Sequence, residues 1–436
     1  MPDFIVFFLS PKKVYKKVYK EIWREKEHFC NFIGVKPIKY ENMKNTFILF
    51  IISVCFFSCI EEYKMPETLS ISHEAELVIQ GRILAGEESV IYISKTQPLG
   101  ETRQETPITH AKVTVIGQNG YESDLAIYDE QQMTYLVDTK NISENTHYAI
   151  RVELDDETYQ SSFQTIYNTP EIEEITYKER EDGVSLHVST SNANNGARAY
   201  MWSYEEDWEF HADINMAIVN DGVMLYSENF YQLNGTQNPY NFCWGHKKSN
   251  NIIVYSTEGL KENQVKEHEL TRVPTNDIRI SYIYCISVKQ WCLSPEAYRY
   301  FRTVKLYTED TGGLFAPMPA EVPGNVSCIS NPDLKVHGYV IASNVKTKRL
   351  FVYQANLQKI HSEYSNCSYS FVKDYMDKPN WENELRKLMR DHGFAIFTPS
   401  GQMDEESILY HNTCVDCRQT AGATKKRPDF WPNDHE

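Results

Sequence analysis

The sequence Tyr148-Ala149-Ile150-Arg151-Val152-Glu153-Leu154 places a large apolar side chain at every second position. Val113 and Val115 alternate with Lys112 and Thr114 in the same way. Side chains of a β-strand point alternately to its two faces, so this period predicts strands with one buried face. Aromatic residues make up 13% of the chain, which also favours sheet over helix. We therefore expect a mainly β protein.

Short turn sequences recur between the predicted strands of the first region, at Ala85-Gly86, Leu99-Gly100, Asn119-Gly120 and Asp155-Asp156. Several short strands separated by such turns are typical of a β-sandwich. We predict an N-terminal immunoglobulin-like β-sandwich over residues 75–168. This region contains no cysteine, so no disulfide can join its two sheets.

A second, larger β-rich domain with a few helices is expected over residues 169–413, beginning at Thr169-Pro170. Its predicted strands cover residues 184–188, 200–204 and 278–284. One helix should start at Ser294-Pro295, because Ser is a good N-cap and Pro suits the first helical position. Another is predicted over residues 380–392 from its apolar spacing. Residues 205–251 show weak periodicity and are interpreted as long loops.

The segment 43–59 reads MKNTFILFIISVCFFSC. A basic residue, a short apolar run and the small Ser58 before Cys59 are the parts of a lipoprotein signal peptide. We expect residues 43–58 to be removed, lipid on Cys59 to anchor the protein to a membrane, and residues 59–74 to form a tether. Residues 1–42 are predicted to be a mis-called extension. The alternative, an uncleaved anchor helix, would need about 20 apolar residues, and this run is shorter.

The formal net charge is −16, from 60 acidic and 44 basic side chains. Binding to nucleic acid requires a basic surface that neutralises phosphates, so we expect no nucleic-acid partner. An acidic surface suits solubility, or contact with cations or with a basic partner.

Seven cysteines follow Cys59, and two of them form the pair Cys414-Val415-Asp416-Cys417 in the C-terminal tail, residues 414–436. We predict structural disulfides at Cys414 and Cys417, either with each other or with other cysteines, because an exported compartment allows oxidation. A zinc site is a second interpretation, but it would need four protein ligands and no second CxxC exists. A redox pair is a third, but that motif should open a helix after a strand. We expect no metal and no cofactor.

The sequence contains no nucleophile elbow, phosphate loop, metalloprotease motif or calcium loop. We therefore expect that the protein is not an enzyme and binds through aromatic side chains of the loop-rich stretch. The candidate binding residues are Trp202, Trp208, Tyr231 and Trp244. The alternative is that these aromatic residues belong to the core. Two other functions stay open, a hydrolase with an unrecognised site and a structural or adhesive surface protein.

Several short blocks of the chain share a pattern with one protein family. The blocks are Leu293-Ser294-Pro295-Glu296-Ala297-Tyr298, Tyr300-Phe301, Gly312-Gly313-Leu314-Phe315-Ala316-Pro317-Met318-Pro319, Gly324-Asn325-Val326, Gly338-Tyr339, and the tail residues Cys414, Cys417, Arg418, Gly422, Thr424, Pro428, Phe430 and Trp431. The chain thereby resembles a Bacteroidota family, domain of unknown function 4249. The tail departs from the pattern at Ala423, where a second Gly would be expected.

The resemblance implies a mainly β fold with an immunoglobulin-like front half. It also implies an outer-membrane lipoprotein, exposed at the cell surface, with an accessory role beside a TonB-dependent receptor, such as ligand capture or lid formation. Glu61 and Glu62, just behind Cys59, resemble a signal for export to the surface in that phylum. The resemblance implies no catalytic residues. Gly312-Gly313 and Gly324-Asn325 are interpreted as scaffold, at turns that need positive φ.

Overall fold

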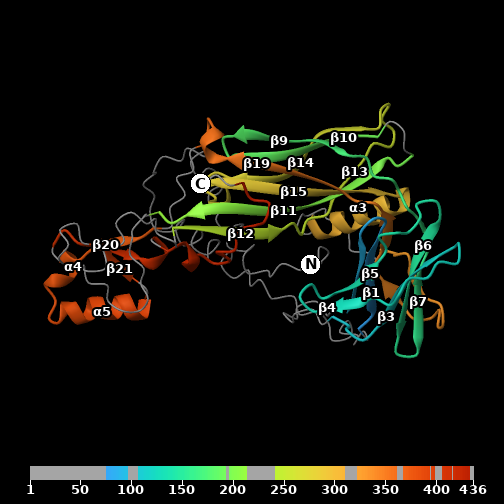
Figure 1. Ribbon diagram of the computed structural model, residues 1–436, viewed down its shortest axis with the longest axis horizontal. Coiled ribbons are helices and arrows are strands. Elements are labelled where there is room, and N and C mark those ends of the chain that lie inside the picture. Colours follow the sequence, from blue (N-terminus) through green and yellow to red (C-terminus); the bar gives the residue numbers. More distant parts are fainter. Residues whose placement is uncertain are drawn as a thin grey trace, which may run out of the picture. The chain divides into compact units, whose positions relative to one another are not determined.

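The computed structural model (Figure 1) describes residues 75–96, 107–192, 196–213, 241–309, 322–360, 367–392, 394–397, 405–414 and 416–432. Apart from Ala75 and Glu76, these residues belong to one compact unit. The predicted extension 1–42, signal peptide 43–58 and tether with Cys59 lie outside the described residues, as do Leu99-Gly100, Gly312-Gly313 and the candidate binding residue Tyr231. Within the described ranges, no helix is long and apolar enough to cross a bilayer.

The described part of the chain is mainly β, as predicted, and its first sandwich consists of two sheets. One sheet has the order β17-β1-β2-β5-β4, with β18 also paired to β1, and the other has the order β16-β7-β6-β3, with β8 on β6. The first contains β1 (Leu77–Leu84), β2 (Glu88–Lys95), β4 (Ile127–Asp129), β5 (Thr134–Asp138), β17 (Val336–His337) and β18 (Val340–Ser343). The second contains β3 (Lys112–Gly117), β6 (His147–Leu154), β7 (Glu157–Ser161), β8 (Gln164–Thr165) and β16 (Val326–Cys328).

The core of this first sandwich follows from the alternation in the sequence. The side chains of Tyr148, Ile150, Val152 and Leu154 on β6 are all buried in one cluster with alternate residues of β1, β2, β3 and β5. Asn119-Gly120 makes a turn in which Gly120 has a φ of +84°, a conformation that costs glycine little.

The first sandwich is completed by strands from far along the chain. β1 pairs in parallel with β17 and β18, and β16 pairs with β7, so residues 326–343 belong to these sheets although the sequence placed them in the second domain. A boundary at residue 168 therefore does not separate the two sandwiches. The immunoglobulin-like interpretation stays a prediction, since the parallel strands come from outside the stretch for which it was made.

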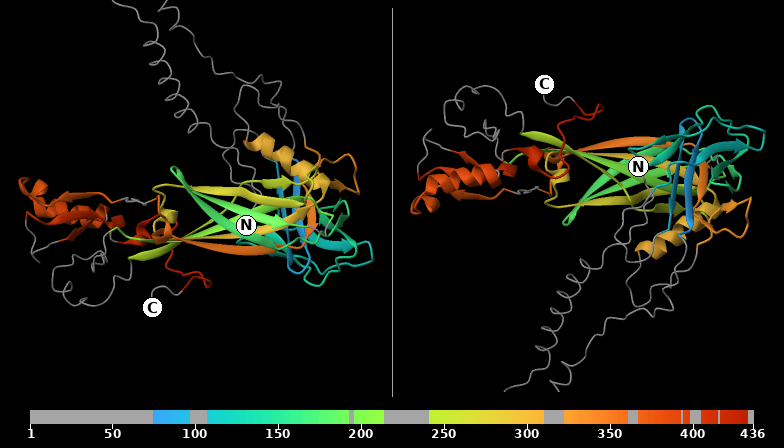
Figure 2. Two further views of the ribbon diagram at one scale, coloured as in Figure 1. Left: turned by 90° about the horizontal axis from the view of Figure 1, so that it is seen from above. Right: turned by 90° about the horizontal axis from the view of Figure 1, so that it is seen from below.

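The second sandwich packs a three-stranded sheet on a five-stranded one (Figures 1 and 2). The smaller sheet has the order β14-β10-β9 and contains β9 (Ile172–Arg180), β10 (Gly183–Ser191) and β14 (Gln264–Pro274). The larger has the order β12-β11-β15-β19, with β13 on β11. It contains β11 (Ala199–His211), β12 (Phe242–Lys248), β13 (Ile253–Ser256), β15 (Ile283–Leu293) and β19 (Lys346–Tyr353). The strands predicted over 184–188 and 200–204 are confirmed as parts of β10 and β11.

Two predictions for this region are wrong in part. Residues Ile278–Ile280 form a 3₁₀ helix rather than a strand, because the carboxylate of Asp277 accepts the backbone N–H of Arg279 at 2.9 Å and caps that turn. The interpretation of 205–251 as loops fails at both ends, since β11 continues to His211 and β12 begins at Phe242. The strand was missed because Glu206 and Glu209, which stand among its aromatic residues, are typical of solvent-facing positions, whereas here both are buried and hydrogen-bonded.

Both predicted helices are present. α3 (Pro295–Glu309) is capped by Ser294, whose Oγ accepts the N–H of Ala297 at 3.0 Å. α5 (Trp381–His392) lies with α4 (Lys373–Met376) and a sheet of order β20-β22-β21, made of β20 (Tyr369–Phe371), β21 (Phe394–Phe397) and β22 (Ile408–His411). Short 3₁₀ turns cover Gln354–Asn356, Asn412–Cys414 and Cys417–Gln419.

Candidate functional site

Trp202, the first candidate binding residue, belongs to the core of the second sandwich. Its side chain is 0% exposed, its ring stacks on Tyr200 at 5.8 Å between centroids, and its Nε1–H donates to Gln290 Oε1 at 2.8 Å. A buried indole with a satisfied donor has no surface to offer a partner. The binding interpretation is therefore wrong for Trp202, and the core alternative holds.

Trp244 is also buried, at 4% exposure. Its backbone N–H donates to Thr424 O at 2.9 Å, and Thr424 N–H donates back to Trp244 O at 2.8 Å. Phe242, two residues earlier, packs its ring edge-on at 5.6 Å. The C-terminal tail thus covers the strand that carries Trp244, and the binding interpretation is wrong here too. We call Phe242, Trp244, Phe351 and Trp431 the tryptophan cluster.

Trp208 is half-buried and lies over the backbone of Gly245, where an added Cβ would come within 2.2 Å of the indole Cε2. This packing explains why glycine stands at position 245, opposite Trp208 on the neighbouring strand. Trp208 acts as a packing residue between strands, and its indole N–H is buried.

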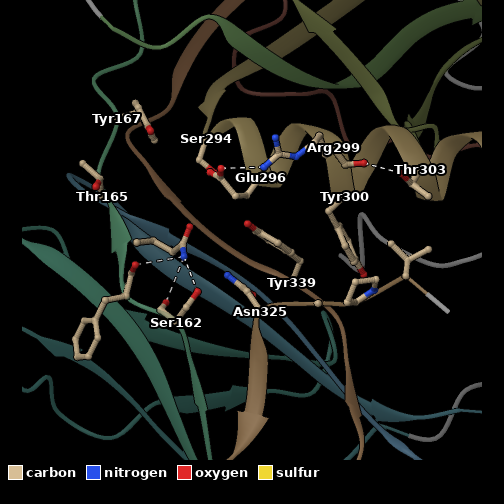
Figure 3. A pocket seen from close by; sticks show the side chains of 15 residues that line it. Ser162, Thr165, Tyr167, Ser294, Glu296, Arg299, Tyr300, Thr303, Asn325 and Tyr339 are labelled. Carbon is tan, nitrogen blue, oxygen red and sulfur yellow. Dashed lines mark hydrogen bonds and ion pairs between the residues drawn. The ribbon is translucent and has the colours of Figure 1, made fainter.

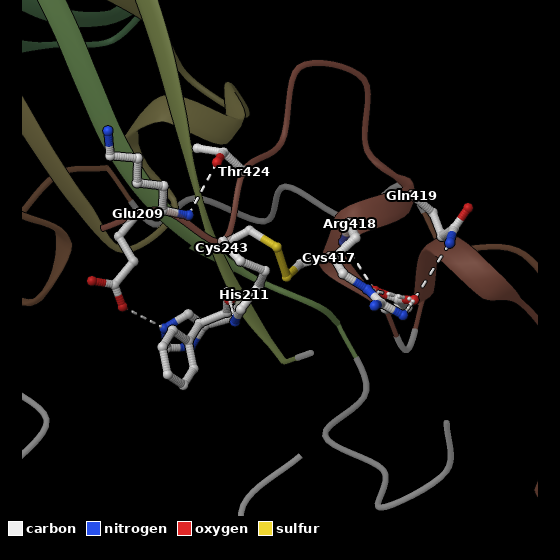
Figure 4. The surroundings of a disulfide bond; sticks show 11 residues. Glu209, His211, Cys243, Cys417, Arg418, Gln419 and Thr424 are labelled. Carbon is white, nitrogen blue, oxygen red and sulfur yellow. Dashed lines mark hydrogen bonds and ion pairs between the residues drawn. A yellow bond between two sulfur atoms is a disulfide. The ribbon is translucent and has the colours of Figure 1, made fainter. Parts of the chain in front are cut away.

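The tail is held in place by a disulfide between Cys417 and Cys243 on β12 (Figure 4). At its far end the Nε1–H of Trp431 donates to Glu209 Oε2 at 2.8 Å, and His211 Nε2 lies 3.0 Å from the other oxygen of that carboxylate. Glu209 is 0% exposed, so these bonds compensate a fully desolvated charge.

Both cysteines of the CxxC motif are in disulfides, but each pairs with a distant residue rather than with the other. Cys414 bonds to Cys367 and so closes the module that contains α4 and α5. Cys285, Cys292 and Cys328 are free thiols, all buried. Burial raises the pKa of Cys285 and of Cys292 to about 12, which suppresses the reactive thiolate. No group of metal-binding side chains occurs among the described residues.

A pocket of about 570 Å³ lies where the first sandwich meets α3 (Figure 3). Its lining is aromatic, hydroxyl-bearing or amide-bearing for the most part, with one carboxylate and one guanidinium. The lining residues are Ser162, Phe163, Gln164, Thr165, Tyr167, Ser294, Glu296, Arg299, Tyr300, Thr303, Val322, Pro323, Gly324, Asn325 and Tyr339. We call this the tyrosine pocket, after Tyr167, Tyr300 and Tyr339.

The helix α3 supplies one wall through its amphipathic spacing. Ala297 and Phe301 are buried against the sandwiches, while Glu296, Tyr300 and Thr303 line the pocket at the three- and four-residue spacing of one helical face. The rings of Tyr300 and Tyr339 lie 4.8 Å apart between centroids and are inclined by 34°.

Two glycines set the position of Tyr339. Gly338 has a φ of +106°, and a Cβ there would lie 2.1 Å from Ile79 O on β1. A Cβ on Gly324 would lie 1.8 Å from Gly338 O, so three backbone segments stack here without side chains between them. Gly324 is therefore required for close approach of backbones rather than for the positive φ that the sequence analysis expected.

Asn325 joins the walls of the pocket. Its Oδ1 accepts the N–H of Val340 at 2.7 Å, and its Nδ2 donates to Val340 O at 2.8 Å. Its own carbonyl accepts the N–H of Ser162 at 2.7 Å. These three bonds tie β18, the chain before β16 and the segment leading to β8 into one rigid frame.

The electrostatics of the pocket are close to neutral. Arg299 Nη2 lies 3.0 Å from Glu296 Oε1, with side chains 70% and 63% exposed. Burial raises the pKa of Tyr300 to about 12 and also raises the pKa values of Tyr167 and Tyr339. The phenols therefore stay protonated at physiological pH and can both donate and accept hydrogen bonds. No His, Cys or Asp is among the described lining residues.

Sequence reasoning did not single out this site. Ser294, Glu296, Tyr300, Gly324, Asn325 and Tyr339 all lie in blocks that carry the family resemblance, but those blocks were interpreted as scaffold. The occurrence of these residues in the same blocks was the sequence signal that could have indicated the pocket.

The fold and the site define a β-protein of two sandwiches with a neutral, tyrosine-lined pocket beside the N-terminal half of α3. A family model described as domain of unknown function (DUF4249) matches residues 60–349, and the chain belongs to this family. The matched range contains the whole tyrosine pocket, whereas the tail and the α4–α5 module follow it. No curated protein is significantly similar to the chain.

Proposed function

We propose that this protein is a Bacteroidota lipoprotein, anchored by lipid on Cys59 in the outer membrane, which binds a ligand at the cell surface beside a TonB-dependent transporter. The observation that carries the binding role is the tyrosine pocket: a space of about 570 Å³ lined by rigidly framed polar and aromatic groups. Ligand sites are usually concave, largely preformed and furnished with a few fixed polar groups.

The anchor rests on the sequence around Cys59. Acyl chains contribute about 0.8 kcal/mol per buried methylene, so their loss should release the protein. We expect Cys59→Ala to abolish membrane retention after a high-salt wash, whereas Cys55→Ala, a matched change four residues earlier, should not. A Cys59→Ala protein that still sediments with membranes would contradict the proposed anchor.

The transporter partnership can be tested by affinity purification from native membranes. We expect a TonB-dependent receptor to co-purify with the wild-type protein in near-stoichiometric amount. If no such receptor co-purifies from mild-detergent extracts, the proposed partnership is wrong, whereas the proposed ligand-binding role is unaffected.

The proposal includes that the protein performs no chemistry of its own. In the pocket the carboxylate of Glu296 faces Arg299, an arrangement that serves position and charge balance rather than proton transfer. Turnover of a small substrate by the purified protein, lost in Glu296→Gln, would contradict this part of the proposal.

A further inference from the structure

The tyrosine pocket presents rings from three separate elements. Tyr300 comes from α3, Tyr339 from the start of β18, and Tyr167 from the chain after β8. Each ring combines an apolar body with a hydroxyl tip, and Tyr300 and Tyr339 lie within van der Waals reach of each other. A ligand for this surface needs an apolar face as well as polar edges.

Half of the remaining polar side chains carry hydroxyls, and two more carry amides. Thr303 donates to Arg299 O at 2.8 Å, which leaves its oxygen as an acceptor, and the Oγ of Ser162 accepts from Gln164 Nε2 at 2.8 Å, which leaves its hydrogen to donate. A set of hydroxyls in which one can accept and another can donate matches a ligand whose own groups both donate and accept hydrogen bonds. An entirely apolar ligand would leave these groups without partners, which is unfavourable.

The charges of the pocket give no preference for an anion or a cation. The chain carries a net charge of −16, yet the described lining has one acidic and one basic side chain, and these two form an ion pair. An anion or a cation would have to break that pair to find a counterion. An extended peptide would need free backbone groups at a strand edge, and beside the pocket the Ser162 N–H already donates to Asn325 O.

We propose that the tyrosine pocket binds a neutral saccharide, with a pyranose face against the partly exposed ring of Tyr300, which the buried Tyr339 supports from behind, and the sugar hydroxyls bonded to the surrounding hydroxyl and amide groups. This inference rests on the proposed function, and it names the chemical class of the ligand. Sugars meet the three conditions together, because they carry an apolar ring face, many hydroxyls and no charge.

The test is saturation-transfer NMR on the detergent-solubilised protein with maltose, cellobiose, lactose and N,N′-diacetylchitobiose as probes. A sialylated trisaccharide and neutral tripeptides serve as contrasting probes. We expect transfer to at least one neutral disaccharide, its loss in Thr303→Arg, which fills the pocket, and its retention in Leu306→Arg. Leu306 lies on the same helix, 41% exposed and outside the lining, so this variant controls for the added charge.

A second variant tests the pocket without disturbing the fold. Tyr300→Phe retains the ring and removes one hydroxyl, so its melting temperature should match the wild type while the affinity for the bound disaccharide falls about five- to tenfold. Unchanged affinity in Tyr300→Phe and Thr303→Arg would overturn the saccharide assignment.

The outcomes separate the inference from the proposed function. Transfer to the tripeptides or to the charged trisaccharide, lost in Thr303→Arg while neutral disaccharides give none, would overturn the saccharide class and leave a ligand-binding pocket. If no probe shows saturation transfer that is lost in Thr303→Arg, both the saccharide assignment and the proposed ligand-binding function are overturned.

Discussion

The tryptophan cluster and the tyrosine pocket are two aromatic regions of one protein with opposite surroundings. In the tryptophan cluster, Trp244 is buried under a tail that contributes the buried Trp431 and that a disulfide holds down. In the tyrosine pocket, Tyr300 is partly exposed and, with the buried Tyr339 beside it, lines a space of about 570 Å³ on walls framed by glycines and Asn325. The tryptophan-bearing stretch had the stronger sequence signal for binding, yet the structure opens a cavity at the other.

Aromatic content alone therefore does not distinguish a buried core from a ligand-binding site. The outcome depends on what covers the rings, and here the cover comes from residues 416–432, where Cys417 follows Cys243 of β12 by 174 positions.

The largest effect is expected from removing the disulfide that holds the tail. Cys243 and Cys417 are separated by 174 residues, so the double change Cys243→Ser with Cys417→Ser should lower the free energy of unfolding by about 5 kcal/mol through the entropy of the unfolded chain. Tryptophan fluorescence should also shift to the red as Trp244 and Trp431 meet water. Denaturant titration followed by fluorescence measures both.

The matched control is the second disulfide. Cys367→Ser with Cys414→Ser opens a separation of 47 residues, for an expected loss of about 4 kcal/mol, and should leave the fluorescence of the tryptophan cluster in place. Equal red shifts in both double variants would show that the tail does not cover the cluster by itself.

The next effect concerns the frame of the pocket. Gly324→Ala would bring a Cβ to 1.8 Å from Gly338 O, which only a backbone shift can relieve, so we expect a loss of about 1–3 kcal/mol and a displaced Tyr339. The melting temperature and the affinity for a pocket ligand should fall together. Gly196→Ala, where nothing lies within 4 Å of the added Cβ, should change neither.

A smaller effect compares one polar atom in each region. Trp431→Phe removes the donor to the buried Glu209 carboxylate and should cost about 1.5–3 kcal/mol, the usual range for a hydrogen bond to a charged group. Tyr300→Phe removes a hydroxyl that faces the pocket and should change stability by under about 0.5 kcal/mol. Similar losses of stability in the two variants, measured by chemical denaturation, would contradict the distinction between core and site.

The smallest effect is the response to acid. Burial lowers the pKa values of His187 and His268 in the second sandwich below their ordinary 6.5. The unfolded chain then binds more protons, so their contribution to stability is present above pH 6.5 and is lost as the pH falls. His246 acts oppositely: its bond to Asp207 raises its pKa, so its contribution is lost as the pH rises. Removing the opposing group in His246→Gln should therefore increase the stability lost between about pH 7.5 and about pH 5.5, as measured by chemical denaturation at the two pH values.

Ligand binding in the tyrosine pocket should not follow that trend. No His is among its described lining residues, and the raised pKa values of its phenols keep them protonated, so affinity should stay constant from about pH 6 to about pH 8. An affinity that falls in step with His protonation would show that the pocket is coupled to the second sandwich.

Local patterns in the sequence predicted a large part of the fold. The alternation at residues 148–154 became β6, the apolar repeat at 184–188 became β10, and Ser294-Pro295 starts α3 as expected. These features succeed because a strand or a capped helix depends on residues within a few positions of one another. The prediction ended β11 too early for the converse reason. Glu206 and Glu209 are typical of solvent-facing positions, but their partners Arg279 and Trp431 come from distant parts of the chain.

Local sequence patterns were enough to predict a mainly β protein, the positions of two helices and cysteines that could form disulfides. Tertiary structure alone decided which cysteines pair, that residues 326–343 complete the first sandwich, and that the tail buries Trp244. It also brought Tyr167, Tyr300 and Tyr339 to one pocket from three segments. The physical reason is that burial and cavities are properties of surfaces that meet in space, and no local period records which distant segment will lie across a given strand.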